Sequence, residues 1–200
     1  MKNNITVILD SAHGEETPGK RSPDGKFREY LWSRQRIASL RPQFERLGFD
    51  VYETNPSNKE IGLTPRANNA NSVKGRKLFM SLHVDAAGNG RDWLNATGYS
   101  VYTTKGKTQS DDLAECILKR FRAEFPELRG RFDSTDGDLD KEENFTVIYK
   151  ANCPAVLIEW LFQDNRADVE RLQSDDYNSR YEASIVHGVM DFCRQIGWLN

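Results

Sequence analysis

The sequence predicts an α/β fold: a single domain with a twisted, mostly parallel (mixed) sheet of about six strands and helices on both faces. Two observations predict it. Short β-branched and apolar runs alternate along the chain with longer segments whose apolar residues recur at helical spacing. The 200 residues also contain no internal repeat, low-complexity tract or linker, and this length suits one compact domain covering residues 1–200.

Six short runs rich in β-branched, aromatic and aliphatic residues are typical of strands. Each run is apolar enough to be buried in a sheet that carries helices on both sides. Turn-forming or helical segments separate the runs from one another. The predicted strands cover residues 6–9, 50–54, 78–82, 99–102, 145–149 and 155–158.

Apolar residues at helical spacing predict the helices between these strands. The first stripe runs from Ile37 to Leu47, where Gly48 supplies a C-terminal stop. Pro42 lies inside this helix, where it removes a backbone donor, so we expect a kink. Thr64 followed by Pro65 predicts another helix start, with Thr64 as the N-cap. Further helices are expected at residues 110–125, after a cap at Asn165, and up to about Ile196.

Composition excludes several functional classes. The 28 basic and 30 acidic residues give a formal net charge of −2, so no global field favours nucleic acid. No apolar run approaches a membrane span, and the N-terminal one is too short for a signal peptide. We therefore expect no membrane insertion and a protein that is cytoplasmic as synthesised. The three widely spaced cysteines predict buried thiols rather than a disulfide framework: Cys116, Cys153 and Cys193.

Reactive side chains follow three of the predicted strands at their carboxyl ends. His13 follows the first strand, His83 follows the strand at residues 78–82, and Glu159 follows the last. Glu29 stands at the start of the first helix, on the same rim. Ligands of such sheets bind outside the carboxyl ends of the strands, so we expect these four side chains to converge.

Two imidazoles and two carboxylates suit a hydrolytic zinc site. Catalytic zinc commonly takes two histidines and one carboxylate and keeps a fourth position for water. His13, Glu29 and His83 would bind Zn²⁺, and Glu159 would move the proton. Taken singly, either histidine could be a structural residue, and Glu29 could be a first-turn acid favoured by the helix dipole. Glu159 lies inside an apolar run, where an unpaired carboxylate is costly. Its sequence neighbours alone therefore favour a functional role for Glu159 over a structural one.

The third histidine serves as a control. In the last helix Ile185, Val189 and Phe192 form the stripe expected to be buried. His187 lies about 160° around the helix from that stripe, at about 100° per residue. We therefore expect His187 to face solvent and leave it out of the site.

These residues resemble the zinc-dependent N-acetylmuramoyl-L-alanine amidases of the amidase 3 type. The resemblance extends from Val7 to about Cys193, and five motifs in the right order are specific. The family's motifs correspond to Ile8–Gly14, Phe27–Tyr30, Leu63–Asn71, Ser81–Ala86 and Pro154–Glu159, with Phe162 and Asn165 in a short tail.

The resemblance implies hydrolysis of the amide bond between N-acetylmuramic acid and L-alanine in peptidoglycan. It implies Zn²⁺ as cofactor, His13, Glu29 and His83 as its ligands, and Glu159 as the catalytic residue. The partner would be peptidoglycan, a glycan strand with its stem peptide, which the chain would reach after release. We expect a monomer with no separate wall-binding domain.

Three other functions stay open at this point. The chain could be another zinc-dependent amidase or peptidase on the same scaffold, or a cysteine hydrolase that uses Cys153. It could also be a catalytically inactive cell-wall binding module. Retention of all four site residues argues against the module, and Cys153 precedes its strand, at the end opposite the predicted rim.

Two further features bear on substrate choice. Trp160 follows the catalytic glutamate where the family commonly has small residues, so it either stacks on substrate or packs in the core. Residues 129–144 are rich in Asp and Glu, but the sequence beginning at Asp136 does not match the pattern of an EF-hand calcium loop. Lys141 and Val147 occupy the positions that need Gly and Glu. A solvated loop at the rim is expected.

Overall fold

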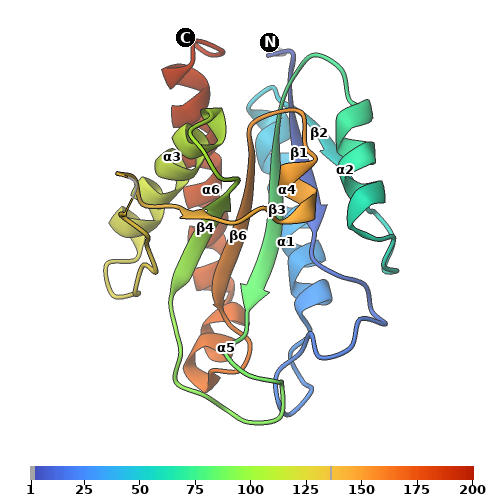
Figure 1. Ribbon diagram of the computed structural model, residues 1–200, viewed down its shortest axis with the longest axis vertical. Coiled ribbons are helices and arrows are strands. Elements are labelled where there is room, and N and C mark those ends of the chain that lie inside the picture. Colours follow the sequence, from blue (N-terminus) through green and yellow to red (C-terminus); the bar gives the residue numbers. More distant parts are fainter. Residues whose placement is uncertain (1–2, 136) are drawn as a thin grey trace.

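Six strands form one sheet in the order β2-β1-β3-β6-β4-β5 in the computed structural model, which describes residues 3–135 and 137–200 (Figure 1). Strands β1, β2, β3 and β6 are parallel, β4 is antiparallel to β6, and β5 is parallel to β4. The predicted mixed, mostly parallel sheet is confirmed. The strands are β1 (Ile5–Ser11), β2 (Asp50–Glu53), β3 (Arg76–Asp85), β4 (Tyr99–Thr103), β5 (Lys141–Glu142) and β6 (Ala155–Phe162).

Helices cover both faces of this sheet, also as predicted. Helices α1, α3, α5 and α6 contribute to the larger core on one face, whereas α2 and α4 pack on the other. The helices are α1 (Glu29–Arg46), α2 (Leu63–Ser72), α3 (Gln109–Glu124), α4 (Thr146–Tyr149), α5 (Arg166–Leu172) and α6 (Asp175–Gln195).

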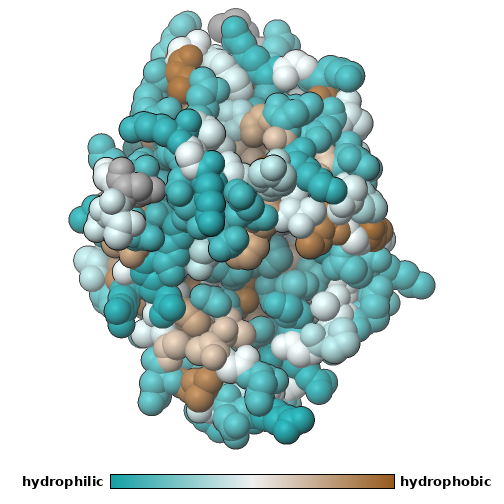
Figure 2. Space-filling view, in the orientation of Figure 1, coloured by the Kyte–Doolittle hydropathy of each residue, from teal (hydrophilic) through white to brown (hydrophobic). Residues whose placement is uncertain are grey.

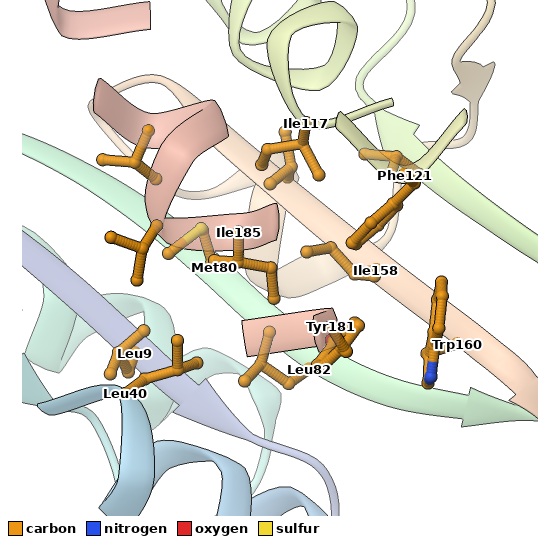
Figure 3. Close-up of a cluster of buried hydrophobic side chains, with 14 of the residues drawn as sticks. Leu9, Leu40, Met80, Leu82, Ile117, Phe121, Ile158, Trp160, Tyr181 and Ile185 are labelled. Atoms are coloured by element: carbon orange, nitrogen blue, oxygen red, sulfur yellow. The ribbon is translucent and has the colours of Figure 1, made fainter. Parts of the chain in front are cut away.

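The larger core lies between the sheet and helices α1, α3 and α6 (Figure 3). Leu82 and Ile158 enter it from the sheet, and Phe121 enters it from α3. Trp160 is fully buried there, with its ring centroid 4.8 Å from that of Phe121 and 4.7 Å from that of Tyr181. The structure therefore gives Trp160 a packing role and removes it from any contact with substrate.

The opposite face of the sheet is apolar over one half and polar over the other. Ile8, Phe79 and Leu157 form a smaller core covered by α2 and α4. Because side chains alternate along a strand, residues two and four positions further on face the same side. Those positions hold the polar residues Asp10, Ser81, His83 and Glu159. The carboxyl half of this face is thus left for chemistry.

The prediction of a strand at residues 145–149 is wrong. Thr146–Tyr149 is the short helix α4, which lies across the sheet face and packs on α2, β3 and β6. Successive residues Val147 and Ile148 are both buried in the smaller core, which a helical turn permits and an alternating strand does not. The strand beside β4 is instead formed by Lys141–Glu142.

Helix boundaries agree with the sequence to within a residue or two, as is usual at helix ends. The exception in detail is α2, whose N-cap is Gly62 rather than Thr64. Asn165 caps α5 by accepting a hydrogen bond from the Asp168 amide, as predicted. His187 is exposed on α6, which confirms its exclusion from the site.

The surface seen in Figure 2 is mostly hydrophilic, with small and separate hydrophobic patches. Among the described residues, no helix combines the length and hydropathy needed to cross a bilayer. The acidic segment is solvated only in part, because Asp133 is exposed whereas Asp140 is 1% exposed. The prediction of a solvated loop is therefore wrong at Asp140.

Candidate metal centre

The structure brings His13, Glu29 and His83 together from three separate elements. Oε1 of Glu29 lies 3.4 Å from Nε2 of His13 and 3.1 Å from Nδ1 of His83. The two imidazole rings meet edge to face, with centroids 5.1 Å apart. One nitrogen or oxygen atom of each residue lies within 4.8 Å of the other two. The three predicted ligands are therefore within reach of one ion.

Local backbone structure sets each of these side chains. His13 follows the end of β1 in a left-handed conformation, φ 53°, which is uncommon for residues other than glycine. Arg34 holds this turn by donating to the carbonyl oxygens of Ala12 and His13, at 3.2 and 3.0 Å. Glu29 is the first residue of α1, and His83 lies near the end of β3. A strained turn held by outside contacts is typical of functional sites.

Glu29 is buried, and its two oxygens have different surroundings. Oε1 faces both histidines and accepts a hydrogen bond from the amide of Val84 at 3.1 Å, whereas Oε2 has no hydrogen-bond partner in the described chain. Burial alone would raise the pKa of Glu29, but the hydrogen bonds and charges of His13 and His83 outweigh it and lower that pKa. Burial lowers the pKa of His83 despite Glu29. A carboxylate beside a neutral imidazole is the protonation state that metal binding requires.

The donor set fits zinc. Nε2 of His13 and Oε2 of Glu29 are buried atoms that lack a hydrogen-bond partner among the described residues. Buried polar atoms are normally satisfied, so two such atoms in one cluster point to a missing partner. Two imidazole nitrogens and one carboxylate oxygen form a common ligand set of catalytic zinc.

Glu159 lies beside this cluster on the neighbouring strand. It is paired in register with His83, so both side chains face the same side of the sheet. Oε2 of Glu159 is buried without a hydrogen-bond partner in the described part of the chain. Burial, followed by the charges of Glu29 and Asp85, raises the pKa of Glu159 well above its ordinary value, while Lys20 opposes this.

An open cavity of about 310 Å³ contains His13, His83 and Glu159 in its wall. Lys20 and Phe145 also line it. All four predicted residues are therefore gathered at one place, with three of them bordering a space that can admit a substrate.

A family model described as N-acetylmuramoyl-L-alanine amidase matches residues 7–191. The chain belongs to this family. It is 26% identical to the N-acetylmuramoyl-L-alanine amidase AmiC of Neisseria meningitidis serogroup B, over 93% of this chain and 52% of that protein. It is 30% identical to the amidase CwlM of Bacillus licheniformis, over 92% of this chain and 65% of that protein. The chain thus spans between half and two thirds of the length of these curated relatives.

The crystal structure of N-acetylmuramoyl-L-alanine amidase from Clostridium difficile 630 has the same fold. It superposes with a TM-score of 0.84 at 25% identity and covers 96% of this chain and 98% of that one. The similarity therefore extends over the whole sheet and both helical layers.

This family member also carries a buried polar chain behind His83 that the sequence analysis did not assign. Nε2 of His83 lies 3.0 Å from Oγ of Ser81, and Oγ of Ser81 donates to Oδ2 of Asp10 at 2.6 Å. Because the single serine proton goes to Asp10, the histidine nitrogen is the donor in its contact. In the metal-bound state that tautomer would present the unprotonated Nδ1 of His83 to the ion, whereas a hydrogen bond to Glu29 requires a proton on Nδ1.

Asp10 is itself anchored from two sides. It accepts hydrogen bonds from Thr54 and from Arg66, the latter at 3.4 Å, and it has no exposed surface. Alternation along β1 and β3 could have revealed this chain, since Asp10 and Ser81 continue the face of Ile8 and Phe79. Such outer partners commonly orient metal-binding histidines.

Proposed function

We propose that this amidase-family chain hydrolyses the amide bond between N-acetylmuramic acid and L-alanine in peptidoglycan. Zn²⁺ would be held by His13, Glu29 and His83, and Glu159 would be the catalytic acid and base. The observation that carries the proposal is the His13–Glu29–His83 cluster. Within the described residues, one buried oxygen of Glu29 and one of the adjacent Glu159 have no hydrogen-bond partner.

The residues divide the work of hydrolysis. Held by His13, Glu29 and His83, zinc would lower the pKa of a water molecule and polarise the scissile carbonyl. Glu159 takes the proton of the attacking water on its carboxylate and returns it to the nitrogen of the departing L-alanine. Its position opposite His83 in the sheet places the carboxylate at the cavity, and its Oε2 has no hydrogen-bond partner among the described residues. Phe145 lines part of the cavity wall.

Product analysis on purified peptidoglycan tests this activity. The zinc-loaded chain should release new L-alanine amino groups without new reducing sugar ends. Reducing ends would indicate a glycosidase. New amino groups on other stem-peptide residues would indicate a zinc peptidase on this scaffold, which is the leading alternative.

Cysteine catalysis has little physical support. Cys153 precedes β6, away from the carboxyl rim, and burial raises the pKa of its thiol to about 11. A nucleophilic cysteine requires the thiolate, which a raised pKa disfavours. Inhibition by a zinc chelator, and resistance to a thiol-alkylating reagent, would separate the two mechanisms.

The remaining expectations concern the state and location of the protein. We propose a monomer that is synthesised in the cytoplasm and acts on the cell wall after release. On the face seen in Figure 2 the hydrophobic patches are small and separate, which favours a monomer. Light scattering on the purified zinc-loaded chain tests it, and a stable dimer at micromolar concentration would contradict it.

A further inference from the structure

A second cluster of carboxylates lies where the acidic segment passes the start of α3. One carboxylate oxygen from each of Asp111, Asp138 and Asp140 lies within 4.8 Å of the other two. Asp140 is 1% exposed and Asp111 5% exposed. None of these residues belongs to the metal centre described above, and the proposed amidase activity uses none of them.

The hydrogen bonds around Asp140 leave one of its two carboxylate oxygens without a partner among the described residues. The hydroxyl of Thr103 lies 2.5 Å from Oδ2 of Asp140 and 3.2 Å from Oδ1 of Asp111, but its one proton serves only one of them. Oδ1 of Asp140 is buried without a hydrogen-bond partner in residues 3–135 and 137–200. Within the same residues, neither Asp111 nor Asp140 forms an ion pair with a basic side chain.

Buried carboxylates in this arrangement repel one another. Desolvation, and with it the charges of Asp138 and Asp111, raises the pKa of Asp140 to about 7, although the Thr103 hydroxyl opposes this. A buried charge is costly unless it is paired or coordinates a metal. Asp111 and Asp140 have no basic partner of this kind within the described residues.

The donor atoms indicate which cation would fit. All are hard oxygen atoms, which suit Ca²⁺ and Mg²⁺ rather than zinc. Calcium binds oxygen at about 2.3–2.6 Å, so two ligands on opposite sides of one ion lie up to about 5 Å apart. The spacing of 4.8 Å or less is within that limit. Mg²⁺ has shorter bonds and demands a more regular octahedron.

We infer that Asp111, Asp138 and Asp140 form a calcium-binding site that fastens the acidic segment to the start of α3. Two hydrogen bonds already tie the same stretch down. The amide of Leu139 donates to Glu115 of α3 at 2.9 Å, and Glu142 accepts from the amide of Gly106 at 2.6 Å. A few residues later the chain reaches Phe145, in the wall of the catalytic cavity. Bound calcium would therefore stabilise the segment that leads into that wall.

Calorimetric titration of the zinc-loaded chain with CaCl₂ tests the site. We expect one calcium per chain and unchanged zinc content. At a hundredfold excess over Kd the Tm should rise by about 5–10 °C, and MgCl₂ should give a smaller rise. Absence of both binding heat and a Tm shift at about 10 mM calcium, above the usual range of weak calcium sites, would overturn the proposal.

Two variants locate the response. Asp140→Asn and Asp138→Asn should abolish calcium binding. Without calcium, Asp140→Asn should melt no lower than the unsubstituted chain, because it loses a buried negative charge. Asp133→Asn is the matched control, since it removes an exposed charge of the same segment, and it should keep the full calcium response. A normal response in Asp140→Asn, or a lost response in Asp133→Asn, would contradict this assignment.

Discussion

Leu82 and His83 are adjacent in β3, and Glu159 and Trp160 are adjacent in β6, yet each pair divides between the two faces of the sheet. Leu82 and Trp160 enter the large core, where side chains are fully buried. His83 and Glu159 face the cavity, where Oε2 of Glu159 has no hydrogen-bond partner in the part of the chain that the structure describes. The packed apolar face stabilises the fold, and this stability offsets the cost of burying polar groups on the other face, where they can bind a ligand. Substitutions on the two faces should therefore have opposite signatures.

The largest effect is expected for His13→Ala, which removes one of the three predicted metal ligands. Zinc content should fall from one per chain to nearly none, and hydrolysis should disappear. Because His13 is the most exposed of the three predicted ligands, the metal-free variant should melt close to the metal-free parent. Metal analysis and thermal unfolding measure both quantities. His187→Ala, on exposed α6 surface, is the control, and full zinc content in His13→Ala would break the comparison.

Glu159→Gln should separate chemistry from metal binding. Gln has the same shape but cannot accept the proton, so the rate should fall by roughly 10²–10⁴-fold. Stability should stay equal or rise, because a buried carboxylate with a raised pKa is removed. Zinc content should stay at one per chain. A rate near that of the parent would show that Glu159 does not transfer the proton.

Trp160→Ala should show the reverse signature. Truncating this fully buried ring should cost roughly 3–5 kcal/mol of unfolding free energy. The folded fraction should still bind one zinc per chain and hydrolyse substrate at a similar rate. Denaturant unfolding, combined with activity per folded molecule, checks this. Unchanged stability together with weaker substrate binding would instead place Trp160 at the substrate.

The smallest effect is expected for Ser81→Ala, which interrupts the contact between His83 and Asp10. Zinc affinity should fall by roughly 10–100-fold, as for other outer partners of metal-binding histidines. Competition with a chromophoric chelator measures that affinity. Ser184→Ala, at a buried serine of α6, controls for the loss of any buried hydroxyl. Equal zinc affinity in the two variants would reduce Ser81 to a packing role.

The sequence was sufficient for the sheet, for its helical layers and for the four gathered side chains. Strand runs such as residues 78–82 and helix starts such as Glu29 are local signals, and the rule for sheet edges brings their ends together. Ser81 and Asp10 were not predicted as site residues, because their hydrogen-bonded contact with His83 depends on strand register. Alternation along each strand indicates that both residues face the same side of the sheet, but the register that places Asp10 opposite Ser81, two residues from His83, comes from the folded sheet.

Two errors have a tertiary cause. Val147 and Ile148 have the β-branched composition of a strand. Burying both against α2 and β6 stabilises the fold more than a position at the sheet edge would, so a helical turn forms. Asp140 follows the polar residues of an acidic segment, and its burial depends on contact with α3, far away in the sequence. The role of each site residue and the identity of the ion stay predictions.

The segment around α4 places buried and exposed side chains within five residues of one another. Val147 and Ile148 point into the small core, while Phe145 and Tyr149 are 36% and 62% exposed. Phe145 also borders the catalytic cavity. A change at Phe145 would therefore alter the wall of this cavity, while Val147 and Ile148 keep α4 anchored in the small core.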